Sequence, residues 1–191
     1  MQVGRMATAH LIGLGHDRIG HLSGDASSVS ADRLEGYKQA LAERKLRFDA
    51  SLVRPCGLLE SDGYQSMRGW LAERDLPRAI FAVNDPAAIG AMKALEEAGI
   101  RIGRDVALVG AGNIHYGDML RVPLTTISWS RAETGQQAAR LLIQLMSGES
   151  QASRPRKIIL PPELVVRNSC GAKPLAKAPV AAAARFVRYS H

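Results

Sequence analysis

The sequence predicts an α/β fold in which a parallel β-sheet is flanked by helices. Short runs of apolar and β-branched residues, bounded by Gly, Pro or Asn, occur at 79–83, 106–110 and 124–128. Such runs are typical of buried parallel strands. Between them lie amphipathic segments with recognisable helix caps. Regular alternation of strand and helix indicates layers packed around one sheet.

The first quarter of the chain predicts helix, strand and helix. Residues 1–16 have a helical rhythm, and "LGH" predicts that this helix ends at Gly15 in a left-handed turn, with His16 able to bond the last carbonyls. "RIGHLS" (18–23) reads as the next strand. A helix from about Ser30 to Arg44 follows. Its inward-facing residues would be Leu34, Tyr37 and Leu41.

The stretch "NDPAAIGAMKALEEAGI" predicts a helix after the strand at 79–83. Asp85 is the expected N-cap, and Pro86 suits the first helical position because its missing N–H would be unpaired there. Gly99 would end the helix. The apolar face consists of Ile89, Met92 and Leu95.

The last part of the chain predicts one long helix, two short strands and a tail. Ser130 and Glu133 have capping-box spacing, so a helix should run over 131–147 and close at Gly148. "KIILPPELVVR" (157–167) reads as two strands around a Pro pair. Residues 171–191 are basic and rich in Ala and Pro, and we expect them to be disordered.

Bulk properties exclude several classes of protein. Hydrophobic residues make up 46% of the chain and charged residues 23%, the balance of a globular protein. No apolar run reaches the ~18 residues of a membrane span, and the start does not resemble a secretory signal. Cys56 and Cys170 stand far apart, as expected of free thiols in a reducing cytoplasm. Of the net charge of +7, the tail supplies +4 and leaves +3 for the body, which lacks the run of Lys and Arg interleaved with aromatic residues that is usual in a nucleic-acid-binding surface.

Three histidines crowd into "HLIGLGHDRIGHLSGD" (10–25), but their spacing does not favour a metal site. His10 and His16 should lie on either side of a helix end, and His21 on the next strand. "GAGNIHYG" lacks the third glycine of a dinucleotide loop, because His115 stands there. No G-x-S-x-G elbow presents a nucleophile. We therefore expect no metal, no cofactor and no catalytic residues.

Polar residues follow almost every predicted strand. Ligands of open α/β sheets bind outside the carboxyl ends of the strands, so these side chains are candidate contacts for a small polar ligand. The candidates are Ser28, Ser30 and Arg33 after the first strand, Asn84 and Asp85 after the next, and Asn113 after the third. Asp85 is also explained as a helix cap. Arg33 has the alternative of a solvated helix-surface residue paired with Asp32 or Glu35.

Several ordered motifs from about residue 4 to 170 closely resemble the effector-binding domain of LacI/GalR-type bacterial transcriptional repressors. They include "RLEGYKQAL", "AIFAVNDPAAIGAMKALEEAGI", "VALVGAGN", "PLTTIS" and "ILPPELVVRNSC". The resemblance implies a type I periplasmic-binding-protein-like fold, with two α/β subdomains around a small-molecule cleft. It further implies a cytoplasmic homodimer whose N-terminal helix-turn-helix headpiece binds operator DNA.

The resemblance also implies roles for individual residues. Arg33 matches the arginine that usually bonds the effector, and Asn84 matches a second frequent contact. Ser28 and Ser30 fall in a loop that frequently lines the cleft. Two positions depart from the pattern.

The first departure is Gly112, which stands where the family usually has an Asp that grips polar atoms of the ligand; only Asn113 is left there. The second is Leu58, which stands where an aromatic ring often stacks on the ligand. Together they argue against a typical sugar effector.

The resemblance predicts that residues 1–170 form an incomplete effector-binding domain, mostly the second subdomain. Residues 131–147 would be a helix of the first subdomain, so its Ala138, Leu142, Leu145 and Met146 should be partly exposed. Operator DNA would bind only through a headpiece outside this chain. The leading interpretation is the effector-sensing module of a repressor. The alternatives are a solute-binding protein of the same fold and, without support from a nucleophile–base pair, an enzyme.

Overall fold

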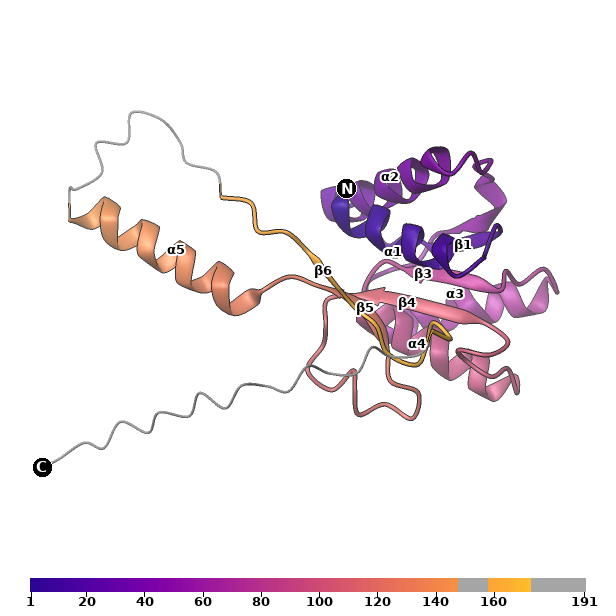
Figure 1. Cartoon of the computed structure of the whole chain (residues 1–191). Coiled ribbons are helices and arrows are strands. Elements are labelled where there is room, and N and C mark those ends of the chain that lie inside the picture. The colour runs from indigo at the N-terminus through magenta and orange to yellow at the C-terminus, as the bar shows by residue number, and fades with distance from the viewer. Residues whose placement is uncertain (148–157, 173–191) are drawn as a thin grey trace, which may run out of the picture.

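The computed structural model describes residues 1–147 and 158–172, and its centre is a six-stranded sheet in the order β2-β1-β3-β4-β5-β6 (Figure 1). The first five strands in this order are mutually parallel, and β6 pairs antiparallel to β5. Their bounds are β2 Val53–Arg54, β1 Ile19–Leu22, β3 Ala79–Ala82, β4 Ala107–Ala111, β5 Thr125–Ser128 and β6 Glu163–Val165. The strand order reverses between β1 and β3, and the carboxyl ends of these two strands form a topological switch point.

Two pairs of helices cover the two faces of the sheet (Figure 1). The helices are α1 Gln2–Gly13, α2 Ser28–Glu43, α3 Glu60–Ala72, α4 Asp85–Glu97 and α5 Arg131–Met146, with a short 3-10 helix at Ala50–Leu52. Alternate strand residues face opposite sides: Phe81 and Val109 join the core under α1 and α2, whereas Ile80 and Leu108 join the core under α3 and α4. No helix in the described ranges is long and apolar enough to cross a membrane.

Most of the predicted elements are confirmed within a residue or two. The strands predicted at 18–23, 79–83, 106–110 and 124–128 are β1, β3, β4 and β5. Gly15 and Gly99 end their helices with φ of +93° and +73°. The helix predicted from about Ser30 begins at Ser28, because the hydroxyl of Ser27 accepts the N–H of Ser30 and caps it earlier.

The expected cap of α4 is wrong by one residue. Asn84, not Asp85, is the N-cap, since its Oδ1 accepts the N–H of Ala87 at 2.8 Å. Asp85 is therefore the first helical residue and Pro86 the second. Both Asn and Asp are good caps, so the sequence alone does not choose between them.

The prediction of two strands in 157–167 is half right. Only Glu163–Val165 forms a strand, and because it runs antiparallel, the sheet is mixed rather than wholly parallel. Ile158 to Pro162 form no strand, as expected where two adjacent prolines remove backbone donors. Residue 157, the predicted closing Gly148 and the predicted tail from 173 onward lie outside the described residues.

Helix α5 projects away from the sheet and has no buried residue (Figure 1). Its N-cap is Ser130, whose Oγ accepts the N–H of Glu133, as predicted. The predicted exposure of its apolar side chains is confirmed. Ala138 is exposed, and the exposed fractions of the larger ones are Leu142 57%, Ile143 64%, Leu145 57% and Met146 79%.

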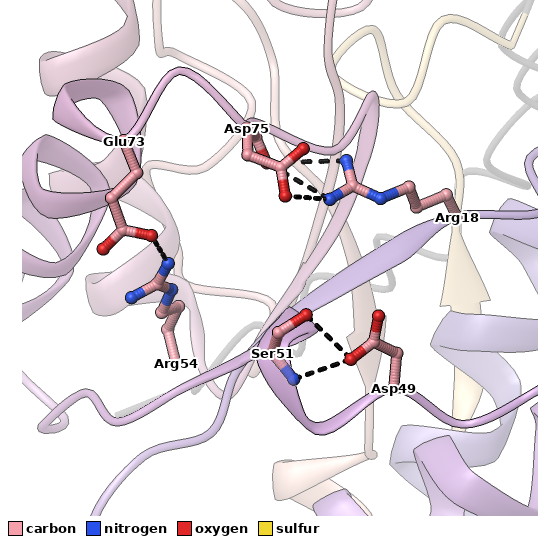
Figure 2. Close-up of polar contacts among 6 residues, drawn as sticks. All are labelled: Arg18, Asp49, Ser51, Arg54, Glu73 and Asp75. Carbon is pink, nitrogen blue, oxygen red and sulfur yellow. Dashed lines mark hydrogen bonds and ion pairs between the residues drawn. The ribbon is translucent and has the colours of Figure 1, made fainter.

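The sequence patterns did not predict β2, which is the edge strand of the sheet, or α3, which packs beside α4. Figure 2 shows the polar contacts that tie this edge of the sheet together. Arg18, just before β1, donates to the carboxylate of Asp75 at 2.5 Å and to its carbonyl at 3.4 Å. Arg54 of β2 pairs with Glu73 at the end of α3. Because all four side chains are at least partly exposed to water, each pair contributes little stability by itself.

Glycines bring the helices of each pair into backbone contact. A Cβ on Gly90 of α4 would lie 1.8 Å from the carbonyl oxygen of Glu60, and one on Gly63 of α3 would lie 2.0 Å from that of Ala87. Helices α1 and α2 repeat the arrangement: a Cβ on Gly4 would lie 2.0 Å from the carbonyl oxygen of Arg33. This close approach of Gly4 to the backbone of Arg33 fixes the distance between α1 and α2 at Arg33.

Replacing Gly90 with alanine should destabilise the protein, because a backbone carbonyl cannot move aside as a side chain can. We expect Gly90→Ala to lower the free energy of unfolding by about 1–3 kcal/mol, the usual cost of overpacking. The matched control is Gly69→Ala in α3, where a Cβ would meet nothing within 4 Å. That change should raise stability by up to ~1 kcal/mol through helix propensity. Chemical denaturation compares the two, and equal effects would contradict close packing at Gly90.

His21 lies in the core between two rings. It stacks on Phe81 at 4.7 Å and on Tyr37 at 5.3 Å between centroids. Its Nδ1 is 3.0 Å from the carbonyl oxygen of Phe81, so a neutral ring with the proton on Nδ1 donates to it. Burial lowers the pKa of His21 from 6.5 to about 4.

This lowered pKa makes stability depend on pH. Below pH 6.5 the imidazole of His21 becomes protonated in the unfolded chain but stays neutral in the folded protein. The free energy of unfolding should therefore fall as the pH drops from 6.5 to about 4. We expect a loss of about 1–3 kcal/mol over this window. His21→Phe should remove most of the slope, leaving the smaller share of His10 and His16, whose pKa values burial also lowers. Denaturation at several pH values tests this, and an unchanged slope in the variant would refute it.

Candidate functional site

Polar side chains from four elements meet at the carboxyl ends of β3, β4 and β5. We call Arg33, Asp85, Asn113 and Trp129 the carboxyl-edge cluster. They come from α2, the start of α4, the loop after β4 and the residue after β5. The cluster lies beside the switch point between β1 and β3, where ligands of open α/β sheets bind.

Arg33 is buried, with 8% of its surface exposed. Its Nη1 donates to the carbonyl of Val83, at the end of β3, at 2.5 Å. The guanidinium carbon lies 5.7 Å from the centre of the Trp129 ring. Burial lowers the pKa of Arg33, and the charge of Asp85 opposes that shift. The alternative of a solvated Arg33 paired with Asp32 or Glu35 is therefore wrong.

Asp85 has a structural partner on each carboxylate oxygen. Oδ1 accepts the hydroxyl of Thr126 at 2.6 Å, and Oδ2 accepts the N–H of Ile114 at 2.7 Å. The side chain is 1% exposed, and burial raises the pKa of Asp85 despite these bonds and the nearby charges of Arg167 and Arg33. Asp85 thus joins α4, β5 and the loop after β4 beneath the site.

Asn84 connects the end of β3 to the loop that carries Leu58. Its Nδ2 donates to the carbonyl of Leu58 at 2.8 Å while its Oδ1 caps α4. An amide has a second N–H and a second lone pair, so Asn84 can also meet a ligand. Leu58 is half-buried and packs against the core under α3 and α4.

The two predicted serine contacts lie in the first turn of α2 rather than in a loop. Ser28 is exposed. Ser30 is buried, and its hydroxyl donates to Asp25 at 2.8 Å. Hydrogen bonds from Ser27 and Ser30 lower the pKa of Asp25. Ser28 is therefore the freer of the two hydroxyls for a ligand.

Asn113 is held from several sides in the left-handed conformation, with φ of +50°. Its Nδ2 donates to the hydroxyl of Ser128 at 3.3 Å, and its Oδ1 accepts from Arg167 at 2.8 Å. Its backbone carbonyl accepts from Arg131, the first residue of α5, at 2.7 Å. The loop after β4 is thereby fixed to β5, to the segment after β6 and to the base of α5.

Sequence reasoning missed Trp129, Arg131 and Arg167. Trp129 directly follows β5, so the rule applied to the other strands would have selected it. Its ring reaches across to β4: Cη2 lies 3.9 Å from where a Cβ on Gly112 would stand. The two arginines gave no local signal, because their acceptors lie 18 to 54 residues away in sequence.

Residues 8–170 match the family model of the periplasmic binding protein-like domain. The chain belongs to this family. The match spans all elements from the middle of α1 to the segment after β6, and it confirms the fold predicted from the sequence motifs.

Relatives of this periplasmic binding protein-like domain are transcriptional regulators. The transcriptional repressor PurR of Haemophilus influenzae (strain PittEE) is 36% identical over 168 residues, which are 87% of this chain and 50% of the relative. The solved lac repressor dimer bound to operator and the anti-inducer ONPF has a TM-score of 0.80 and 32% identity, covering 89% of this chain and 50% of that one. A LacI family regulator from Enterococcus faecium with bound ribose has a TM-score of 0.79 and 29% identity, covering 92% and 63%.

These comparisons confirm the resemblance to LacI/GalR-type regulators. The domain spans about half the length of the curated relatives it matches. The relatives are repressors rather than enzymes. The roles of individual residues of the carboxyl-edge cluster remain predictions.

Asp85 should be important for stability. We expect Asp85→Asn to lower the free energy of unfolding by about 1–3 kcal/mol, because an amide leaves one buried donor, the hydroxyl of Thr126 or the N–H of Ile114, without its acceptor. Asp118→Asn, on the exposed loop after β4, is the control and should stay within about 0.5 kcal/mol of the parent. Thermal and chemical denaturation measure both. Equal stabilities of the two variants would show that Asp85 does not hold the loop.

Proposed function

We propose that this chain is the effector-sensing domain of a LacI-type transcriptional regulator, and that a small polar molecule binds at the carboxyl-edge cluster. The observation that supports this most is the buried guanidinium of Arg33 at the switch point of the sheet. Its Nη1 bonds Val83, while Nε and Nη2 have no acceptor among the described residues. A planar fork with free donors suits a ligand that accepts two parallel bonds.

The relatives support the remaining parts of the proposal. The lac repressor was solved as a dimer on its operator with a small anti-inducer, and the Enterococcus faecium regulator holds ribose. By analogy, the whole protein would be a cytoplasmic homodimer that binds operator DNA through a region outside this chain. A solute-binding protein of the same fold would use the same edge, but the relatives favour a regulator.

The contacts of the cluster suggest how a bound ligand would be sensed. Trp129 directly precedes the N-cap of α5, and Arg131 of α5 donates to the carbonyl of Asn113. A ligand that contacts Trp129 or Asn113 would therefore contact a residue directly connected to the base of α5, by the chain or by a hydrogen bond. Because a ligand shifts a conformational equilibrium only through differential contacts, these two residues are the proposed route from effector to the rest of the regulator.

Arg33→Ala should abolish most effector binding without unfolding the domain. The experiment screens small polar metabolites, both neutral sugars and organic anions, for a rise in Tm, and then measures affinity by calorimetry. We expect binders to lose about 1.5–3 kcal/mol in Arg33→Ala, the range for hydrogen bonds to a charged group. The exposed Arg44→Ala, at the C-terminal end of the same helix, is the control and should bind as the parent does. Retained affinity in Arg33→Ala, or a complete absence of binders, would count against the proposed site.

A further inference from the structure

The buried charge of Arg33 lacks a counter-charge of its own. Charged groups in protein interiors are normally paired, because burying an isolated ion is costly. Arg33 is 8% exposed, yet within the described residues no carboxylate lies within 4 Å of its nitrogens. Asp85 is the one carboxylate whose charge affects the pKa of Arg33, and both its oxygens already accept bonds. Arg33 therefore makes no ion pair with the described residues, and its free donors are suited to a negatively charged ligand group.

Other charges nearby do not fill this role. Asp25 accepts bonds from Ser27 and Ser30 at the start of α2. Glu133 is exposed on the first turn of α5. Arg167 donates to Leu124 and Asn113, so it adds positive charge without taking up an acceptor that Arg33 needs.

Trp129 lies near Gly112, the residue that stands where the LacI/GalR pattern usually has an acid. A Cβ on Gly112 would lie 3.4 Å from Oδ2 of Asp85 and 3.9 Å from Cη2 of Trp129, so the space beside Gly112 lies between the Asp85 carboxylate, whose two oxygens already accept hydrogen bonds, and the edge of the indole. The ring is half-buried, stacks near Arg33 and lines an open groove of about 450 Å³ with residues of α5 and with Ile158 to Leu160. The indole of Trp129 thus gives the groove a flat apolar surface next to the guanidinium of Arg33.

We propose that the site takes a small organic anion with a flat apolar face, held by Arg33 through its charge and by Trp129 through stacking. This inference rests on the proposed function and narrows its ligand class. The free edge of Arg33 forms parallel bonds to a carboxylate, while the indole face favours a planar body over a compact one. A neutral sugar lacks the negative charge that would pair with the guanidinium of Arg33.

Four small molecules, each titrated into the whole chain and followed by calorimetry, distinguish the effect of the ligand's charge from that of its shape. Benzoate is a flat anion, benzamide its neutral counterpart, acetate an anion without a flat face, and ribose a neutral sugar. We expect benzoate to bind at least about ten-fold tighter than the other three, because only benzoate satisfies both groups. Trp129→Leu should reduce the benzoate affinity to that of acetate, while Trp129→Phe, which keeps an aromatic face, should retain the preference. Circular dichroism checks that both variants are folded.

The outcomes distinguish this inference from the proposed function. Ribose binding that depends on Arg33, with benzoate no better, would keep the effector site and overturn the anion proposal. Benzamide binding as tightly as benzoate would likewise overturn it, since charge would then play no part. An unchanged benzoate affinity in Trp129→Leu would remove Trp129 from the site. Failure of all four probes to bind would count against both the inference and the effector site.

Discussion

The hydrogen bond from Arg33 to the carbonyl of Val83 joins the two parts of the molecule that make the site. It connects α2 to the end of β3 at 2.5 Å, at the point where the strand order reverses. The contact requires α2 to sit at one height over the sheet, and the close approach of Gly4 to the backbone of Arg33 sets that height. The packing of α1 against α2 and the polar contacts at the edge of the sheet therefore depend on each other: the packing that buries Arg33 also leaves Nε and Nη2 without an acceptor among the described residues.

Burial explains how the same edge can be stable and still provide the proposed binding site. Asp85 and Asn113 use most of their capacity on Thr126, Ile114, Ser128 and Arg167, so they fix the loop after β4. Arg33 retains donors without an acceptor among the described residues, and the half-buried ring of Trp129, with the Arg33 guanidinium over it, lines the groove. Since Trp129 leads directly into α5, whose apolar side chains are exposed, ligand contact and the helix that leaves the sheet are neighbours in the chain.

Sequence patterns predicted the elements whose signals are local. The apolar runs of β1, β3, β4 and β5 and the caps at Ser130, Gly15 and Gly99 need only neighbouring residues, and all are confirmed. The two-residue strand β2 is too short for a periodic signal. The cap of α4 was misplaced because Asn84 and Asp85 are both suitable, and only packing against Thr126 draws Asp85 inward. The direction of β6 and the bonds of Arg131 and Arg167 are tertiary, so no window of sequence contains them.

The most direct test of this account is to observe the guanidinium of Arg33 itself. In a ¹⁵N–¹H NMR spectrum of arginine side chains, the Nε–H of buried Arg33 should exchange slowly with water and be identified by its loss in Arg33→Lys. On titration with benzoate, this resonance should shift saturably, together with the indole N–H of Trp129, while the resonances of exposed arginines such as Arg44 stay in place. Binding at Arg33 would be contradicted if benzoate moved the resonances of exposed arginines but left those of Arg33 and Trp129 unchanged.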